Sequence, residues 1–495
     1  MKSESKNFTY QTRLLLDDKD INLLSEYSSL FGKVERTLFH DLATGKKVGE
    51  LKTLYLKKFG ITARQFNSVR SQIEGKIASC KEVRTGHIQE KKRGIIALEK
   101  SIKKLKNTLI LHQKKRRLGQ LQAQLQALEE DATAGRVRIC FGSRKLFRAQ
   151  FQLQENGYAS HDAWYDDWLQ ARNSSFFLIG SKDEVSGNQS CTATLLEDGS
   201  LGLRLRLPDA LSMYGKYLHI SNIRFRYGHE AIVSALEAGS VAISYRFKRD
   251  KKGWTVFATI PCQGAKKVTR DGFGVQTLGV LGVDINADHL AVTETDRYGN
   301  PIQYKKIPCV LYGKSQNQAK ALIGDAAKDL VAWSARTEKP VVIEQLDFQK
   351  KKAELRETGT TRYRRMLSSF SYNSIITSIQ SRAFRYGVHV KEVNPAYSSL
   401  IGRAKFCKRY GISIHQSAAL TLGRRYLRFS ERLPRHLDAI HDGKNGYVAF
   451  SLPARNREKH VWSLWRQVQK KLPTVLAAHF RPTFSRSSGR KTPAC

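Results

Sequence analysis

The spacing of hydrophobic and polar positions changes along the chain and divides it into three parts, which begin near residues 8, 135 and 279. Residues 8–16 are rich in Phe, Tyr, Thr and Leu and predict a strand. Residues 20–131 repeat apolar positions at intervals of three and four, which predicts helices throughout. After Gly135 the period becomes two, which predicts β-hairpins, and from Gly279 onward strands and helices alternate.

The first two parts predict a small β-barrel with an inserted helical lobe. A lone strand ahead of helices belongs to a sheet completed later, so residues 1–16 are grouped with residues 135–270 as the barrel. Its hairpin turns are expected at residues 198–199 and 252–253, and a short aromatic helix over residues 161–173 interrupts it. The inserted lobe is then residues 17–134. The predicted fold class is α+β and multidomain.

The third part, residues 275–450, predicts an α/β domain. Its expected elements are a strand at 280–284, strands at 290–293 and 303–307, a helix at 315–337, a strand at 341–344, a helix at 371–386, a strand at 388–393 and, after an irregular stretch, a helix beginning near His415. Residues 451–495 form a C-terminal extension, whose Ser-, Arg- and Lys-rich tail is expected to be disordered.

Two of these strands deliver an acid to their ends. The apolar run at residues 280–283 leads into Asp284, and the run at 340–343 ends in Glu344. Either acid alone is equally well explained as a strand-end residue facing water. Together they fit an RNase H-like nuclease, because the order is three strands, a helix and a fourth strand, with the acids ending the first and the fourth strand. In such a nuclease carboxylates hold two Mg²⁺ ions. Asp284 would bridge both ions and Glu344 would bind one.

A third ligand is expected at the start of the last helix, and the residue there is His415. Imidazole is a weak ligand for Mg²⁺, so His415 would either weaken the site or act as a base or proton shuttle beside it. A histidine hydrogen-bonded to backbone at a helix start is an equally good explanation. Three other acids are available as the missing ligand: Asp347, Glu431 and Asp438.

The charge of the chain points to a polyanionic partner. Its 495 residues include 85 Lys and Arg against 44 Asp and Glu, a formal net charge of +41. Nucleic acid is the expected partner, because each neutralised phosphate releases counterions. Two cationic clusters are the candidate contacts. One lies in the loop after Glu344, where aromatic residues stand between the cations, as in a site for a single nucleic-acid strand; it consists of Lys350, Lys351, Lys352, Arg362, Arg364 and Arg365. The other lies in a predicted helix and consists of Lys114, Lys115, Arg116 and Arg117.

Other classes are disfavoured by the sequence. No segment has the apolar length of a membrane span, and the first residues lack the continuous apolar core of a signal peptide. The seven cysteines form no C-x-x-C pair, so neither a zinc ribbon nor a disulfide framework is predicted. A cytoplasmic, nucleoid-associated protein with reduced thiols is expected.

Several short motifs, in this order, resemble the transposon-encoded TnpB (OrfB) proteins, which are related to compact type V CRISPR effectors. The likeness is clear from residue 241 to residue 425, and before that only as architecture. The matching segments are YRFKR at 245–249 followed by Trp254, GVDIN at 282–286 with Leu290 and Ala291, VIEQLDF at 342–348, NPAYSS at 394–399 and SAA at 417–419.

The resemblance implies an RNA-guided, Mg²⁺-dependent DNA endonuclease, with a wedge barrel, an inserted recognition lobe and a RuvC-like nuclease domain. A guide RNA would pair with target double-stranded DNA, and the protein would read a short adjacent duplex motif. Asp284 and Glu344 match the first two catalytic acids of the family. The third acid falls at His415, and of the family's zinc-ribbon cysteines Cys407 alone remains.

Three functions are therefore compared. The first is the guided endonuclease, and the second is a guided DNA-binding protein with weak or absent cleavage, as in members of the lineage without a full acidic triad. The third is a transposase-like or integrase-like strand-transfer enzyme, since RNase H-like domains serve these too. The intact acids favour the first, and the inserted basic lobe favours guide RNA over direct transposition. Whether a second copy assists as a homodimer is left open.

Overall fold

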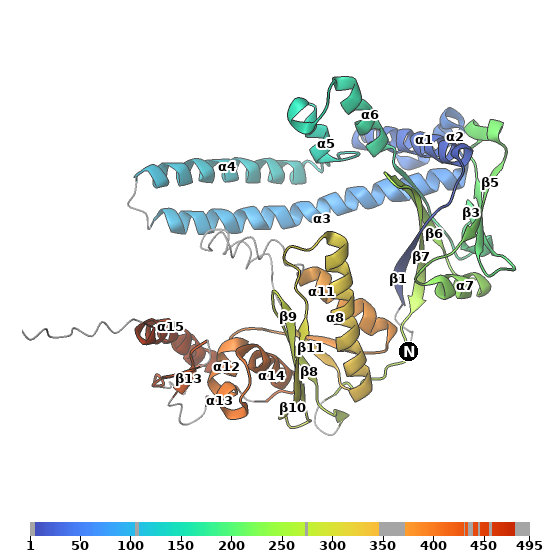
Figure 1. Cartoon of the computed structure of the whole chain (residues 1–495). Helices are drawn as coiled ribbons and strands as arrows, with labels where there is room; N and C mark the ends of the chain where they lie inside the picture. Colours follow the sequence, from blue (N-terminus) through green and yellow to red (C-terminus); the bar gives the residue numbers. More distant parts are fainter. Residues whose placement is uncertain are drawn as a thin grey trace, which may run out of the picture. The chain divides into compact units, whose positions relative to one another are not determined.

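The computed structural model describes residues 5–103, 108–272, 276–345, 372–429, 431–433, 439–443, 446–454 and 458–480. The chain divides into two compact units, Met1–Gln263 and Gly264–Cys495. Figure 1 shows the elements of both units, coloured along the sequence. None of the helices in the described ranges is long and apolar enough to cross a membrane.

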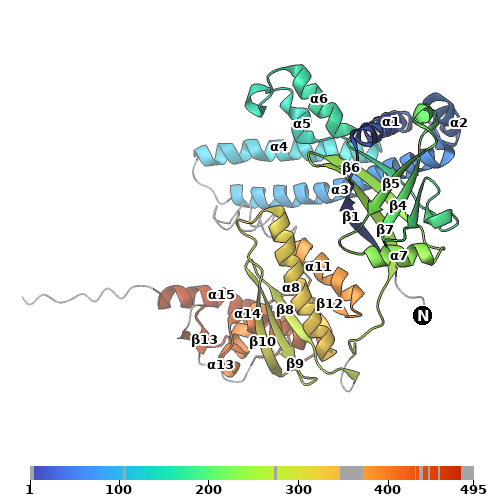
Figure 2. The same cartoon turned by 45° about the vertical axis from the view of Figure 1, so that its right-hand side comes forward.

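The described helices of the first unit confirm the helical prediction within residues 20–103 and 108–131. They are α1 (Asp18–Ala43), α2 (Val48–Phe59), α3 (Ala63–Ile102) and α4 (Thr108–Thr133), followed by α5 (Arg144–Ala149), α6 (His161–Arg172) and α7 (His229–Glu237). The start of α3 is fixed by a capping box, in which Thr62 and Gln65 each bond the other's backbone N–H. At 40 residues α3 is about 60 Å long, and α4 packs along it as a hairpin (Figures 1 and 2).

The strands of the first unit form two sheets. Their bounds are β1 (Ser5–Arg13), β2 (Ser175–Leu178), β3 (Cys191–Leu195), β4 (Leu201–Arg206), β5 (Tyr217–Ile223), β6 (Ser244–Asp250) and β7 (Gly253–Gln263). One sheet has the order β1-β7-β6-β2 and the other β3-β4-β5. The first strand does join a sheet completed later, with Phe8 opposite Ile260, and both predicted turns lie between paired strands. Closure into a barrel stays a prediction.

The second unit is organised around one five-stranded sheet. Its strands are β8 (Leu281–Ile285), β9 (His289–Thr295), β10 (Pro301–Pro308), β11 (Val341–Glu344) and β12 (Val390–Val393), in the order β10-β9-β8-β11-β12. The pairs β10–β9 and β9–β8 are antiparallel, whereas β8–β11 and β11–β12 are parallel. Helices α8 (Gln316–Thr337) and α11 (Tyr372–Arg385) precede β11 and β12. This element order agrees with the sequence prediction.

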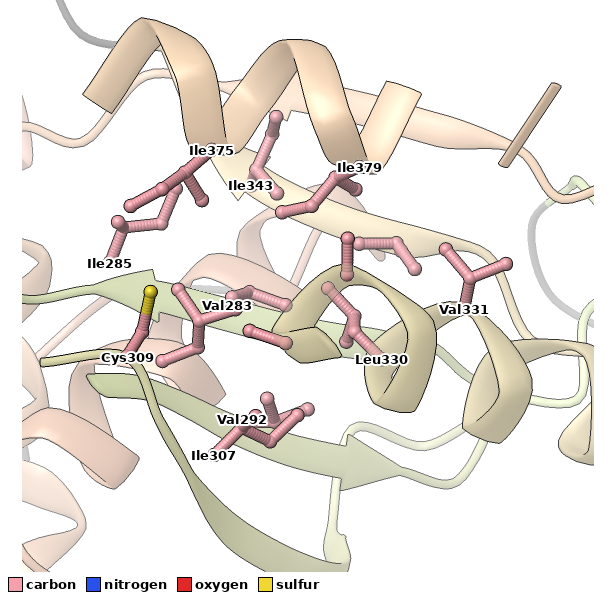
Figure 3. Close-up of a cluster of buried hydrophobic side chains, with 14 of the residues drawn as sticks. Val283, Ile285, Val292, Ile307, Cys309, Leu330, Val331, Ile343, Ile375 and Ile379 are labelled. Carbon is pink, nitrogen blue, oxygen red and sulfur yellow. The ribbon is translucent and has the colours of Figure 1, made fainter. Parts of the chain in front are cut away.

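One face of this sheet is covered by α8 and α11. Alternate strand residues such as Val283 and Ile343 point into the apolar core that these helices complete with Leu330 and Ile379 (Figure 3). Because side chains alternate across a strand, the residues between them face the opposite side. Asp284 is therefore on the face away from α8 and α11.

Helix α14 (Ile414–Tyr426) covers that opposite face. The Thr293 hydroxyl donates to the Gln416 carbonyl at 2.8 Å, which fixes the helix start against β9. At Gly282 the helix comes so close that a Cβ atom would lie 2.0 Å from the Ala419 carbonyl oxygen. Glycine at this position is what allows the backbones of β8 and α14 to approach.

The Gly282→Ala variant should therefore be strongly destabilised. The added methyl meets backbone atoms, which cannot rotate away, so β8 and α14 would have to separate; overpacking of this kind costs about 1–3 kcal/mol or more. A thermal melt of the full-length variant measures the loss. Gly324→Ala is the matched control, because nothing lies within 4 Å of a Cβ atom there, and an equal loss in both variants would contradict the close approach.

The region around α14 corrects one sequence prediction. The stretch between residues 393 and 415, expected to be irregular, contains α12 (Ser398–Lys405) and α13 (Cys407–Tyr410). A further helix, α15 (Val461–His479), and the short strands β13 (Ala439–His441) and β14 (Tyr447–Ala449) complete a second core around Trp465. Helix α12 has only eight residues, too few to show a clear helical period in the sequence.

Candidate active site

Asp284 and Glu344 lie side by side at the carboxyl ends of two neighbouring parallel strands. The register of β8 and β11 pairs Leu281 with Val341 and Val283 with Ile343, so the two acids follow at the same level. Adjacent strands are about 4.8 Å apart, and residues level with each other face the same side of a sheet. Both acids are buried, with 7% and 8% of their surfaces exposed. The structure thus brings the two strand-borne acids together, and their role as a metal site stays a prediction.

His415 is brought to this pair by the first turn of α14. Ser413 caps the helix through a capping box with Gln416, at 3.2 and 3.0 Å, so the helix begins one residue before His415. The His415 Nδ1 donates to Asp284 Oδ2 at 3.0 Å. This hydrogen bond raises the pKa of His415, and burial opposes the rise. The side chain of His415 thus bonds a carboxylate, and the alternative of a purely backbone-bonded histidine is wrong.

A second histidine stands next to the first. His289, the first residue of β9, is buried and its ring meets the ring of His415 edge to face, with centroids 5.3 Å apart. Its Nδ1 bonds Asp288 at 2.7 Å. Burial lowers the pKa of His289, and the bond to Asp288 opposes this. His289 was not among the predicted site residues. It lies on the same face as Asp284, because it is two residues from Ala291, which pairs with Asp284 in the sheet.

Two further polar groups support the acids. Asn286 donates to Asp284 Oδ2 at 3.0 Å, so in the described chain both side-chain hydrogen bonds to Asp284 use the same oxygen. The Tyr372 hydroxyl, from the start of α11, donates to the Glu344 carbonyl at 2.8 Å. Burial, followed by the nearby charges of Glu344, Glu392 and Asp284, raises the pKa of Tyr372, so this phenol stays protonated. Nothing in its sequence context singled out Tyr372.

The other predicted residues divide into three groups. Glu431 is not a ligand of this site, because its carboxylate pairs with Arg425 and accepts from Trp462 Nε1 at 2.9 Å. Lys114 to Arg117 lie on α4, where Lys114 bonds Ser101 of α3 at 2.6 Å and the next three cations are exposed. The acids Asp347 and Asp438 and the loop cations Lys350, Lys351, Lys352, Arg362, Arg364 and Arg365 lie outside the described residues.

The donor set fits a hard cation in part. Within the described ranges no three His, Cys, Asp or Glu side chains gather as a complete metal site. Two buried carboxylates at the same level are nevertheless oxygen ligands of the kind Mg²⁺ prefers, and Mg²⁺ is usually held by one or two carboxylates with water and substrate phosphates. His415 adds nitrogen, which Mg²⁺ binds weakly.

Comparisons with known proteins give distant likenesses. No protein-family model matches the chain. No curated protein matches it either. Among solved structures, the chain is similar to RuvC of T. thermophilus in complex with Holliday junction substrate, at 15% identity and a TM-score of 0.22, over 30% of this chain and 90% of that chain.

It is also similar to two structures of type V effectors. One is a Cas12i–crRNA–dsDNA complex in the I1 state, at 10% identity and a TM-score of 0.24, over 70% of this chain and 60% of that chain. The other is the Cas12i1 R-loop complex after target DNA cleavage, at 10% identity and a TM-score of 0.25, over 77% of this chain and 57% of that chain. The chain thus spans about three fifths of the length of these two proteins.

Proposed function

We propose that this protein is a metal-dependent nuclease of RuvC-like type that cuts DNA under the direction of a bound guide RNA, as a TnpB-type protein would. The observation that carries the nuclease proposal is the pair of buried carboxylates, Asp284 and Glu344, level with each other on β8 and β11. Two carboxylates buried side by side offer oxygen ligands of the kind that Mg²⁺ prefers. The order of three antiparallel strands followed by two parallel ones supports an RNase H-like domain.

In this proposal the two acids hold Mg²⁺. Because Asn286 and His415 both bond Oδ2 of Asp284, Oδ1 is the oxygen left for a metal ion. Bound Mg²⁺ would supply Lewis-acid activation of a water and stabilisation of the leaving 3′ oxygen. The two acids suffice for one ion. The second expected ion would need ligands from the substrate or from residues outside the described ranges.

The residues around the acids position them. Asn286 fixes the plane of the Asp284 carboxylate, and Tyr372 holds the backbone of Glu344 where β11 ends. His415 lies half exposed beside Asp284, with 50% of its side chain accessible. We propose that it holds or moves a proton at Nε2, the ring nitrogen that is not bonded to Asp284, because Asp284 raises its pKa and its nitrogen suits Mg²⁺ poorly.

The guide-RNA part of the proposal is supported by charge. The formal net charge of +41 favours binding of a polyanion that extends well beyond the cleavage site. The α3–α4 hairpin offers a surface about 60 Å long, and Lys115, Arg116 and Arg117 are exposed on it. A helical surface of this length suits a nucleic-acid duplex recognised through its backbone.

The proposal is tested by purifying the protein with its co-expressed RNA, sequencing that RNA, and adding matched double-stranded DNA with Mg²⁺. We expect a discrete bound RNA and Mg²⁺-dependent cleavage of the matched DNA alone. Guided binding without cleavage would select the binding-protein alternative. Absence of bound RNA, with joining of DNA ends, would select the strand-transfer alternative.

A further inference from the structure

A pocket in the first unit brings together side chains from elements that are distant in sequence. It is formed by α1, α5, α6 and the turn between β6 and β7, and its volume is about 520 Å³. Its lining includes the apolar side chains of Leu146 and Leu169, of which Leu169 is exposed. Sites for small molecules are about 300–1,000 Å³ and mix apolar walls with a few polar groups. The pocket therefore has the size and character of a site for a molecule such as a mononucleotide.

Trp254 lines this pocket with an indole that lacks a hydrogen-bond partner. The residue is 1% exposed, and in the described part of the chain no acceptor bonds its Nε1. Buried N–H groups almost always have a partner, because leaving one unsatisfied costs free energy. An acceptor atom of a ligand in the pocket would satisfy this N–H.

Two cations line the pocket near Trp254. Arg249 is paired with Trp254 in the register of β6 and β7, so the two side chains are on the same face of the sheet. One nitrogen of Arg249 donates to the neutral hydroxyl of Ser25 at 3.0 Å. Lys251 follows in the turn and is exposed. Neither cation forms an ion pair with an acid among the residues that the structure describes, so both charges are available to an anion.

Two acids also line the pocket, and one of them is already paired. The carboxylate of Asp250 accepts from both terminal nitrogens of Arg13, at 2.7 and 3.0 Å. Asp167, an exposed residue of α6, accepts from the Tyr158 hydroxyl at 3.0 Å through Oδ2, which leaves Oδ1 for a ligand. Gln170, three residues further along α6, adds an amide that can both donate and accept. The pocket thus offers neutral donors and acceptors as well as its two cations.

The walls of the pocket are held by hydrogen bonds that need no ligand. Arg36 of α1 donates to the side-chain oxygen of Asn173 at 2.8 Å, and the Ser28 hydroxyl donates to the Asn173 carbonyl. These bonds tie the end of α6 to α1, next to the pocket that Asn173 lines. A ligand would therefore bind a preformed site, which reduces the free-energy cost of ordering side chains on binding.

We propose that this pocket binds a nucleotide, with its phosphate on Arg249 and Lys251 and its base beside Trp254. Guanidinium and ammonium groups bind phosphate well. A base carries N–H donors and ring acceptors along its edge, which suit Asp167 and Gln170 as well as the indole N–H. The nucleotide is either free or an unpaired nucleotide of an RNA, and only the second source rests on the proposed function. All lining residues belong to the first unit, so the acids of the second unit play no part.

The test is a calorimetric titration of the full-length protein with each common nucleoside 5′-monophosphate and with the matching nucleosides. The preferred monophosphate should bind roughly tenfold or more tightly than its nucleoside, because hydrogen bonds to a charged group are stronger than neutral ones. Lys251→Ala should weaken the monophosphate roughly threefold to tenfold and leave the nucleoside unchanged. Lys252→Ala is the matched control, since it makes the same change at the next exposed residue, outside the pocket lining, and should bind as the wild type does.

The indole N–H of Trp254 gives a second, direct measurement. In protein with isotope-labelled tryptophan, the indole resonance that disappears in Trp254→Phe belongs to this residue, and it should shift when the monophosphate binds. If Trp254→Phe does not fold, Gln170→Ala at an exposed position of α6 replaces it. That variant should weaken nucleotide and nucleoside by the same factor, because it removes a contact to the base alone.

A single-stranded oligoribonucleotide distinguishes the two sources of the ligand. If the ligand is a nucleotide of an RNA, the oligoribonucleotide should displace the monophosphate, and if the ligand is a free nucleotide it should not. Failure of every monophosphate to bind, or an equal loss of affinity in Lys251→Ala and Lys252→Ala, would overturn the proposal and leave the proposed nuclease untouched. Failure of Mg²⁺-dependent cleavage would count against the nuclease alone.

Discussion

Replacing Asp284 by alanine is expected to abolish DNA cleavage and to leave RNA binding intact. The variant removes one of two buried carboxylates that lie level on β8 and β11, and with it a proposed ligand for Mg²⁺. A metal ion contributes several kcal/mol of transition-state stabilisation, so the rate should fall by roughly 10³-fold or more. Single-turnover cleavage of matched DNA, with and without EDTA, measures the loss.

The matched control is Asp325→Ala, which makes the same change at an exposed position of α8. It should cleave at the wild-type rate. Asp284→Asn should be as inactive as Asp284→Ala while retaining an oxygen that can accept from His415. If Asp284→Ala cleaves normally, or if it no longer co-purifies with RNA, the assignment of the site to Asp284 and Glu344 is wrong.

The largest expected loss of stability comes from Lys339→Met. Lys339 is buried between α8 and β11, and its Nζ lies 2.6 Å from Glu294 Oε1 on β9. The other oxygen of Glu294 accepts from Trp333 Nε1 at 2.9 Å. Removing the lysine leaves a carboxylate buried without its cation, which costs about 3–5 kcal/mol. For a unit of this size the melting temperature should fall by roughly 6–20 °C.

Differential scanning calorimetry of the full-length variants checks this prediction. Arg270→Ala breaks an ion pair with Glu338 whose side chains are 60% and 43% exposed, and such a pair contributes only about 0–1 kcal/mol. Lys339→Met combined with Glu294→Gln should recover part of the loss, since it also removes the stranded charge. An equal effect of Lys339→Met and Arg270→Ala would show that the buried pair contributes no more than the exposed one.

The sequence predicts the helices and strands in which apolar residues recur at a clear interval or form a continuous run. The apolar runs ahead of Asp284 and Glu344 predicted both strands, and the structure puts the two acids level with each other. Strand pairing was not predictable from either run alone, because the register of β8 and β11 depends on α8 packing across the sheet. The composition of residues 8–16 predicted a strand that joins a later part of the chain, but it did not identify β7 as the partner.

Side-chain neighbours from distant segments were harder to predict. His289 is the first residue of β9, and its contact with His415 exists only because α14 packs across the sheet at Gly282. The hydrogen bond from Tyr372 to the Glu344 carbonyl joins two segments that are distant in sequence, and no local sequence pattern predicts it. The charge of Glu431 made it a candidate metal ligand in the sequence. In the structure its carboxylate is bonded to Arg425 and Trp462 instead.

The pairing of β1 with β7 has a consequence during synthesis. Ser5 is opposite Gln263, so the edge of β1 has no partner until the ribosome has added the intervening residues. At ~5–20 residues per second this takes roughly 10–50 s. The helices α1 to α4 rely on contacts between near neighbours in sequence and can form in that interval. An unpaired strand edge attracts other chains, so fast translation or a chaperone that covers the first residues should raise the yield of native protein.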